Sequence, residues 1–287
     1  MVVVFSVIFP KNLQFFPAFL ASLENQTNAA FTLVLINDGV VNLDYFLKDV
    51  ALNVEVLVVN STSPFELRLL GLGKVFNMGA KYIIFADTDD LLSPERVEIS
   101  ISNLDNYPFV CNDISLMDST GNILANSFWA ERVSNGYEFD IQYIKNKNII
   151  GLGNSAIHHD ALYKILKTLA GHSRGNDWLF FSAAERNLNA IFVSECRTLY
   201  RQHDNNIIGK KEVDRATLFN IINEKIEHYN SLKKINFDAY NVDDQIELNQ
   251  NILQRCKADP DFCDNQIKKI NSLGINFFWW EESNYIN

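Results

Sequence analysis

The chain contains few cysteines, and none of them has the spacing of a metal site. Its 287 residues include Cys111, Cys196, Cys256 and Cys263, with no C-x-x-C pair. Zinc sites and disulfide frameworks both need regularly spaced cysteines, so neither is predicted. Cys111 and Cys196 lie in apolar, strand-like stretches and are predicted to be buried thiols.

Positive charge is also scarce. The 25 lysines and arginines are outnumbered by 35 aspartates and glutamates, which gives a net charge of −10. Neutralising a phosphate backbone requires a basic surface, and the Lys210-Lys211 pair is too small to supply one. No nucleic-acid partner is therefore predicted.

Long apolar runs are missing as well. No stretch approaches the roughly 18 apolar residues of a membrane-spanning helix. Residues 1–9 lack the basic region and cleavage site of a signal peptide, and they predict a first strand instead. Residues 277–280, Phe-Phe-Trp-Trp, could touch a membrane interface, where tryptophan is favoured. The adjacent Glu281-Glu282 would be repelled by anionic lipid, which favours packing against the rest of the chain instead. We expect a cytoplasmic protein, with at most peripheral contact at the inner face of a membrane.

The most informative stretch that is present is 82–90. An apolar, β-prone run ends there in three carboxylates, those of Asp87, Asp89 and Asp90. Carboxylates at the end of a buried strand repel one another and lose hydration, so they need a cation or hydrogen-bond donors. Hard oxygen ligands suit Mg²⁺ or Mn²⁺, which share the phosphates of a substrate. The alternative is a solvated acidic turn before a helix, but residues 93–95, Ser-Pro-Glu, already predict that helix's N-terminal cap.

The first half of the chain alternates predicted strands and helices, which indicates an α/β fold with an open sheet covered on both faces. Ligands of such sheets bind beyond the carboxyl ends of the strands. Asp38 and residues 87–90 both follow predicted strands, so we expect them to share one crevice. The predicted strands are Val2–Phe9, Phe31–Ile36, Val54–Val59 and Tyr82–Ala86, and the predicted helices are Phe15–Leu23 and Pro64–Ala80.

The alternation breaks after residue 106. A turn at 118–121 predicts an antiparallel pair formed by Tyr107–Met117 and Asn122–Ala125. From Glu212 onward the spacing is helical. We therefore predict a domain at 1–209, divided into halves 1–106 and 107–209, and an α-helical extension at 210–287. The other predicted elements are helices at His159–Leu169, Asn176–Asn187, Thr217–Leu232, Asp243–Lys257 and Cys263–Leu273, and strands at Ala190–Val193 and Arg197–Arg201.

Six short segments follow one another in a recognisable order: Ser6–Pro10, Ser22–Thr27, Leu35–Gly39, Asp87–Asp90, Asn176–Trp178 and Tyr200–Asn206. Together they resemble the opening strand, first helix, second-strand turn, D-x-D motif, catalytic acid segment and Tyr-Arg-x-His motif of the family 2 glycosyltransferases. The resemblance covers about residues 1–209. It implies the GT-A fold, a Rossmann-like mixed sheet flanked by helices. It also implies a metal-dependent, inverting transfer of a sugar from a nucleotide-diphosphate sugar to a saccharide or lipid-linked saccharide, in surface polysaccharide synthesis.

The resemblance further implies a donor site, most favourably for a UDP-sugar. Asp38 would accept a hydrogen bond from the base, Asp87 would contact the ribose, and Asp89 would bind Mn²⁺ or Mg²⁺ bridging the diphosphate. Asp90 is the alternative metal ligand and His203 an additional one. Of the family's usual Ala-Arg-Asn only Asn77 remains, which leaves Arg68 or Lys74 to approach the diphosphate. The implied donor residues are Pro10, Asp38, Arg68, Asp87, Thr88 and Asp89.

On the acceptor side, the resemblance implies that Asp177 is the general base. Asn154, Asn176 and Trp178 would line the same side, and Trp178 would exclude water and so raise the pKa of Asp177. The alternative for Asp177 is an ordinary acid in the first turn of a helix, where it favours the helix dipole.

Two other functions remain open at this point. A nucleotidyltransferase would need a glycine-rich, basic loop after the first strand, which residues 10–14 do not provide. Neither Gly71-x-Gly73 nor Gly151-x-Gly153 completes a dinucleotide or P-loop fingerprint. Asn37 and Asn176 stand where the family has acids, which allows a degenerate sugar-nucleotide-binding module without turnover.

Overall fold

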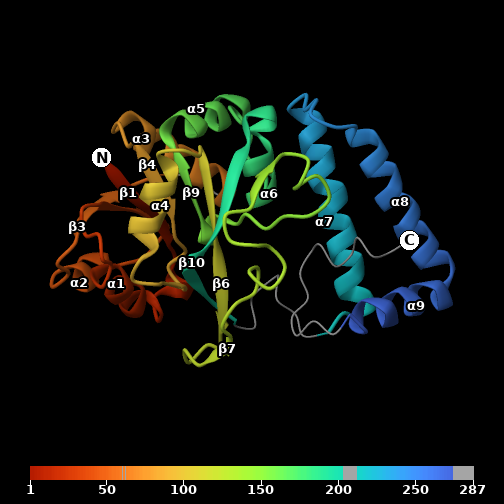
Figure 1. Ribbon diagram of the computed structural model, residues 1–287, viewed down its shortest axis with the longest axis horizontal. Coiled ribbons are helices and arrows are strands. Elements are labelled where there is room, and N and C mark those ends of the chain that lie inside the picture. Colours follow the sequence, from red (N-terminus) through yellow and green to blue (C-terminus); the bar gives the residue numbers. More distant parts are fainter. Residues whose placement is uncertain (60, 62, 203–211, 274–287) are drawn as a thin grey trace. The chain divides into compact units, whose positions relative to one another are not determined.

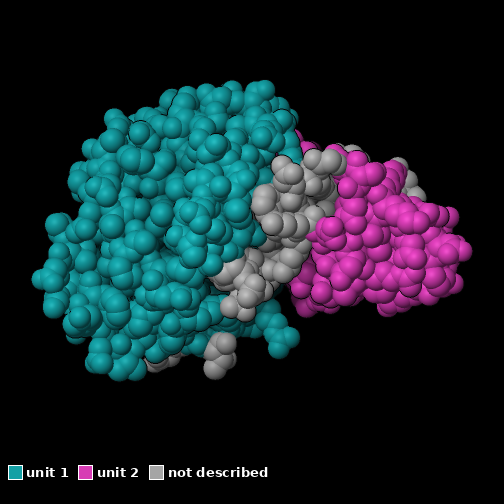
Figure 2. Space-filling model, turned by 90° about the horizontal axis from the view of Figure 1, so that it is seen from below, with its two compact units in different colours: residues 1–140, 149–202 teal, residues 141–148, 203–287 magenta. Residues whose placement is uncertain are grey.

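A computed structural model describes residues 1–59, 61, 63–202 and 212–273 (Figure 1). The chain divides into two compact units (Figure 2). Unit 1 contains residues 1–140 and 149–202, and unit 2 contains residues 141–148 together with the described part of 203–287. The sequence predicts a boundary at 209, which lies outside the described residues, and it assigns 141–148 to the first domain rather than to the second unit.

Unit 1 is built on one mixed sheet with the strand order β3-β2-β1-β4-β9-β6-β10-β5 among the described residues. β3, β2, β1 and β4 are mutually parallel, whereas β9 runs antiparallel between β4 and β6. β7 and β8 pair with β6 and β10. The strands are β1 Val2–Ile8, β2 Thr32–Asn37, β3 Asn53–Leu57, β4 Tyr82–Phe85, β5 Leu91–Leu92, β6 Phe109–Met117, β7 Ile123–Ala125, β8 Glu138–Asp140, β9 Ser155–His158 and β10 Asn189–Arg201.

Helices cover both faces of this sheet, as predicted (Figure 1). One face packs against α1 and α4, through residues such as Val4, Leu33 and Phe19. On the other face, Gly71 of α3 lies against Phe5 and Ile36, and the α6 phenylalanines pack on Phe85. The helices of unit 1 are α1 Phe16–Glu24, α2 Leu43–Leu47, α3 Pro64–Asn77, α4 Arg96–Leu104, α5 His159–Thr168 and α6 Asp177–Ser182, with 3₁₀ turns at Pro10–Asn12, Leu152–Asn154 and Glu185–Asn187.

The predicted elements of the first half are confirmed to within a few residues, and so is the antiparallel pairing of β6 with β7. The predicted cap of α4 is wrong. α4 begins at Arg96 rather than at Pro94, and the hydroxyl oxygen of Ser93 accepts a hydrogen bond from the Arg197 backbone N–H at 2.9 Å. Ser93 therefore fastens the start of α4 to β10 and does not cap the helix.

The two predicted strands at the end of this region form one continuous strand, β10. A register shift between Val193 and Arg197 explains why the sequence looks interrupted there. Both predicted buried thiols are confirmed, with Cys111 and Cys196 at most 1% exposed.

Unit 2 contains α7 Arg215–Lys234, α8 Val242–Ala258 and α9 Pro260–Asn271, which confirms the predicted helical stretches. Each helix begins at a side-chain cap, from Asp214, Asn241 and Asp259. Segment 141–148 belongs to this unit because Tyr229 donates to the Lys145 carbonyl at 2.9 Å and Lys225 donates to the Asn146 carbonyl at 3.1 Å. None of the helices in the described ranges is long and apolar enough to cross a membrane.

Candidate active site

Three of the predicted donor residues follow the carboxyl ends of adjacent parallel strands. Pro10 is exposed and opens the 3₁₀ turn just after β1. Asp38 directly follows β2, and its backbone N–H donates to the Ile8 carbonyl at 2.9 Å. Asp87 comes two residues after β4. Since β1 lies between β2 and β4, these residues follow the carboxyl ends of three adjacent strands, which is where ligands of open α/β sheets bind.

The acidic loop at 87–90 is fastened to β1 by side chains. The Ser6 hydroxyl donates to the Ala86 carbonyl at 2.6 Å, and the Thr88 hydroxyl donates to the Val7 carbonyl at 3.1 Å. Thr88 is fully buried, so it holds the loop in place while its two acidic neighbours are partly exposed.

Asp90 is the most buried of the three acids, with 2% of its surface exposed. Its Oδ1 accepts the Arg201 backbone N–H at 2.8 Å, whereas its Oδ2 is buried and has no hydrogen-bond partner among the described residues. Burial raises the pKa of Asp90 well above its ordinary value, and the charges of Asp89 and Asp87 raise it further. An unpartnered carboxylate oxygen in an acidic loop is what a cation would satisfy.

Arg201 holds the acidic loop from the opposite side. Its Nε donates to the Asp89 carbonyl at 2.7 Å, and its Nη1 donates to the Ser119 carbonyl at 3.2 Å in the β6–β7 turn. Its guanidinium lies 4.6 Å from the centre of the Phe15 ring. The arginine of the Tyr-Arg-x-His segment thus supports the loop, whereas the neighbouring His203 lies outside the described residues.

Asp87 pairs with Arg68 of α3, with 3.7 Å between Oδ1 and Nη2. The pKa of Asp87 is raised to about 6, mainly by loss of hydration, with Asp89 and Asp177 adding to the rise and Arg68 opposing it. Lys74, the other candidate for the diphosphate, donates instead to the Val58 carbonyl at 2.7 Å. Of the two cations, Arg68 is therefore the one that faces the acids.

A buried arginine that the sequence did not indicate lies beneath the site. Arg96 is fully buried and donates to Asn112 Oδ1 at 2.9 Å and to the Phe85 carbonyl at 2.6 Å. Burial lowers its pKa to about 10, while the charges of Asp90 and Asp87 favour its charged form. It ties the end of β4 to β6 and places a counter-charge near the acids.

The loop at 151–154 packs against the acidic loop at 87–90. A Cβ at Gly153 would come 2.9 Å from Asp87 Oδ2 and 3.4 Å from Asp90 Oδ2, so a larger residue would require the acid or the loop to shift. The Asn154 amide holds the loop, since its Oδ1 accepts the Gly151 N–H at 2.7 Å and its Nδ2 donates to the Asn112 carbonyl at 2.9 Å. Asn154 is buried, so its amide shapes the loop.

Asp177 contacts the same loop. Its Oδ2 accepts the Leu152 N–H at 2.9 Å, and its charge contributes to the raised pKa of Asp87. Asn176 is the N-cap of α6, where its side chain accepts the Leu179 N–H at 2.9 Å. Trp178 is 1% exposed, so its side chain packs in the interior and anchors α6 there. The 151–154 loop thus contacts Asp177 and lies against Asp87.

The described residues contain no group of three His, Cys, Asp or Glu side chains that could hold a metal ion unaided. The donor set that they offer is Asp89 and Asp90. This set fits Mg²⁺ or Mn²⁺, which commonly bind one or two carboxylates together with substrate phosphates.

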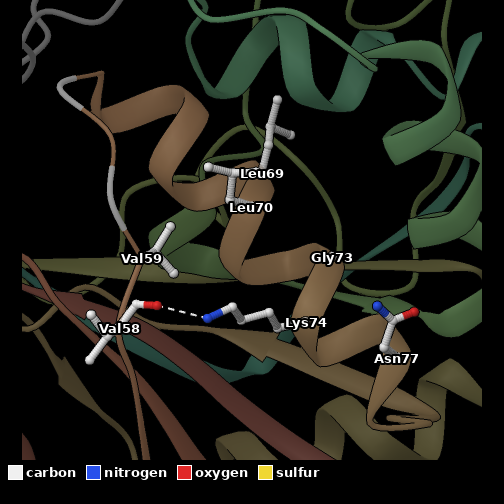
Figure 3. A pocket seen from close by; sticks show the side chains of 7 residues that line it. All are labelled: Val58, Val59, Leu69, Leu70, Gly73, Lys74 and Asn77. Carbon is white, nitrogen blue, oxygen red and sulfur yellow. Dashed lines mark hydrogen bonds between the residues drawn. The ribbon is translucent and has the colours of Figure 1, made fainter.

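A separate hollow lies between α3 and the end of β3 (Figure 3). Its volume is about 480 Å³, and the described residues lining it include Lys74 but no carboxylate. The Lys74 ammonium is used by the Val58 carbonyl, as the dashed line in Figure 3 marks. This hollow lacks the acids of the site described above.

Solved structures with known ligands share this architecture. The S. aureus TarS fragment 1–349 in complex with UDP-GlcNAc superposes with a TM-score of 0.62 and 13% identity, covering 90% of this chain and 73% of TarS. GalNAc-T7 with UDP, GalNAc and Mn²⁺ gives a TM-score of 0.53 and 11% identity, covering 88% of this chain and 54% of that one. The fold is that of a GT-A glycosyltransferase.

A curated relative is also similar in sequence. The amylovoran biosynthesis glycosyltransferase AmsE of Erwinia amylovora is 38% identical over 106 residues, which cover 35% of this chain and 38% of AmsE. No family model matches the chain. In this GT-A unit, the acidic loop and Asp38 follow the parallel strands β4 and β2, and Asp177 accepts the Leu152 N–H of the loop that lies against Asp87.

Proposed function

We propose that this protein is a glycosyltransferase that moves a sugar from a UDP-sugar to a saccharide or lipid-linked saccharide, with inversion, in surface polysaccharide synthesis. The observation that carries the proposal is that one loop, 151–154, contacts both the acidic loop and Asp177. Asp87 and Asp90 approach Gly153, while Asp177 accepts the Leu152 N–H. The UDP-GlcNAc bound by TarS and the biosynthetic role of AmsE support the same conclusion.

In this proposal the acidic loop and Arg68 hold the donor. Asp38 accepts a hydrogen bond from the base, Asp87 contacts the ribose, and the Arg68 guanidinium stabilises the diphosphate. Asp89 and Asp90 would hold Mn²⁺ or Mg²⁺, with His203 as a further ligand. When bound, the cation acts as a Lewis acid that stabilises the charge on the leaving diphosphate.

Asp177 is the general base of the proposed reaction. It removes the proton of the acceptor hydroxyl as that oxygen attacks the anomeric carbon from the face opposite the UDP leaving group. One bond forms as the glycosyl–phosphate bond breaks, so a single displacement inverts the anomeric configuration. The Leu152 N–H orients the Asp177 carboxylate through Oδ2 and leaves Oδ1 for the proton.

Thermal unfolding with nucleotides tests the donor site. We expect UDP with Mn²⁺ to raise the melting temperature, because a ligand that binds only the native state stabilises it by mass action. At a hundredfold excess over its Kd the gain is about 2.7 kcal/mol. GDP and dTDP serve as comparison nucleotides, and EDTA should remove the shift. If no nucleotide shifts the transition, or EDTA has no effect, the proposed metal-bridged donor site is wrong. A shift without any release of UDP from UDP-sugars would instead support the degenerate binding module.

The close approach at Gly153 gives a second prediction. Gly153→Ala places a methyl group within 2.9 Å of Asp87 Oδ2, so the acid or the loop must shift. We expect kcat/KM for the donor to fall by about tenfold or more, since small displacements of an active-site group are costly. Gly73→Ala in α3 is the matched control, because its Cβ would meet nothing within 4 Å and alanine favours a helix. Equal donor kinetics of the two variants would contradict the role given to Gly153.

A further inference from the structure

The segment that leads to Asp177, residues 173–175, forms neither helix nor strand. Residues 173–175 join α5 to α6 and are exposed, and Asp177 is the first residue of α6. The direction in which the Asp177 carboxylate enters the site therefore depends on what holds this segment.

The N-terminus of α3 holds it at two points. The Ser63 hydroxyl, at the N-cap of α3, donates a hydrogen bond to the Ser173 carbonyl. Two residues later, Gly175 lies directly against the Phe65 ring. A Cβ at Gly175 would come 2.7 Å from Phe65 Cζ, 2.9 Å from Phe65 Cε1 and 2.7 Å from Leu179 Cδ2.

Both neighbours of Gly175 are buried, so making room for a Cβ would require a buried side chain or the segment itself to shift. Phe65 is 7% exposed and Leu179 is fully buried, so both are embedded in packed surroundings. The φ angle of Gly175 is not positive, so the glycine is needed here for close approach rather than for backbone conformation.

The same helix contacts the donor acid. Arg68 stands one turn after Phe65 on α3, so the two side chains project from one face of the helix. Arg68 reaches Asp87 at 3.7 Å, while Phe65 supports the segment that leads to Asp177. α3 thus contacts the donor acid, Asp87, through Arg68, and supports the segment before the proposed base, Asp177, through Phe65.

We propose that Gly175 and Phe65 are positioning residues, which seat the 173–176 segment on α3 and thereby set the distance between Asp177 and the donor. This inference rests on the proposed function. Neither residue touches substrate. Their effect is on where the base stands relative to the anomeric carbon, a distance on which the rate of displacement depends steeply.

The test is a double-mutant cycle with Gly175→Ala and Phe65→Leu, assayed in the full chain with UDP-sugar and Mn²⁺. Gly175→Ala should lower kcat about tenfold, while the Kd for UDP and the KM for the donor stay within about twofold. Phe65→Leu removes the Cζ and Cε1 atoms that the new methyl group would strike. The contact with Leu179 Cδ2 remains in the double variant. Gly175→Ala should therefore cost less kcat in the Phe65→Leu background than in the wild type, which gives a favourable coupling between the two sites.

The UDP affinity shows whether each variant is folded with its donor site intact. A wild-type kcat for Gly175→Ala would overturn the inference, and so would a loss of kcat that Phe65→Leu fails to relieve. Equal losses of kcat and UDP affinity would also overturn it, because they indicate general damage. A wild-type protein that neither binds nor turns over a UDP-sugar would overturn the proposed function instead.

Discussion

Replacing Asp177 with asparagine should abolish most of the sugar transfer and leave UDP binding intact. The substitution keeps the size of the side chain and an oxygen that can accept the Leu152 N–H, but it removes the basic group. General-base catalysis contributes about a hundredfold to ten-thousandfold, so we expect kcat to fall by about a thousandfold. The measurement is release of UDP in the presence of acceptor.

UDP affinity should not fall in this variant. The negative charge of Asp177 is one of the causes of the raised pKa of Asp87. Removing that charge favours the ionised form of Asp87, which is the form that accepts hydrogen bonds from a ribose. Titration of UDP and Mn²⁺ should therefore give a Kd equal to or below that of the wild type. A parallel loss of affinity and kcat would show that Asp177 holds the donor rather than the acceptor proton.

Asp160→Asn is the matched control for this experiment. Asp160 is also an acid in the first turn of a helix, in α5, and its side chain is 80% exposed. It shares the favourable interaction of Asp177 with a helix dipole but lies on a different helix. If the two variants lose the same activity, Asp177 acts only through its helix and the assignment of a base is wrong.

The parts of the fold that the sequence predicts best are those set by long local patterns. Residues 2–8 are apolar except for Ser6, and such a run is what a strand buried between two parallel neighbours requires. The acids that follow β4 were equally clear, since three carboxylates at the end of a buried strand have few structural explanations. Asp38 was placed correctly because its position at the end of β2 follows from the strand itself.

The features that the sequence did not reveal depend on partners far along the chain. β9 is only four residues long, and it pairs with β4 and β6 rather than with a neighbouring hairpin strand. Arg96 looks like an ordinary helix residue until the fold brings the Phe85 carbonyl and Asn112 to its guanidinium. Ser93 carries the pattern of a helix cap, but the Arg197 N–H competes successfully for its hydroxyl oxygen.

The acceptor side was the hardest to anticipate for the same reason. Asn154 and Trp178 are predicted to line the acceptor side, yet both side chains are buried in the interior. By contrast, the backbone of the 151–154 loop provides the contacts to the acids, through the Leu152 N–H and the missing side chain of Gly153. Side-chain identity alone carries little information about a contact made by the backbone.

Replacing Asp90 with asparagine should stabilise the protein when no divalent cation is present. Asp90 Oδ2 is buried without a partner, and it approaches the same point of Gly153 as Asp87 Oδ2. In the variant, the amide oxygen can keep the Arg201 N–H, while the buried negative charge near Asp87 and Asp89 is removed. Relieving a buried, unpaired polar group is typically worth about 1–3 kcal/mol, and we expect a gain of about 2 kcal/mol near pH 8.

The gain should depend on pH with a definite sign. Because folding raises the pKa of Asp90, the unfolded chain releases this proton first, near its ordinary pKa of about 3.9. The wild-type protein therefore loses stability as the pH rises from about 4 toward the folded-state pKa, and the asparagine variant does not. The advantage of Asp90→Asn should be small at pH 4 and should reach its full size only above the folded-state pKa.

Thermal unfolding across this pH range, with and without Mn²⁺, measures both effects. Mn²⁺ should stabilise the wild type more than the variant, because the cation compensates the carboxylate repulsion that the variant lacks. Asp118→Asn is a control of opposite sign. Hydrogen bonds from Thr120 and Asn122 lower the pKa of Asp118, so its ionised form is favoured by folding and the substitution should destabilise the protein at neutral pH. A variant of Asp90 that is less stable than the wild type without metal would mean that its carboxylate is held by donors, and that the acidic loop does not need a cation.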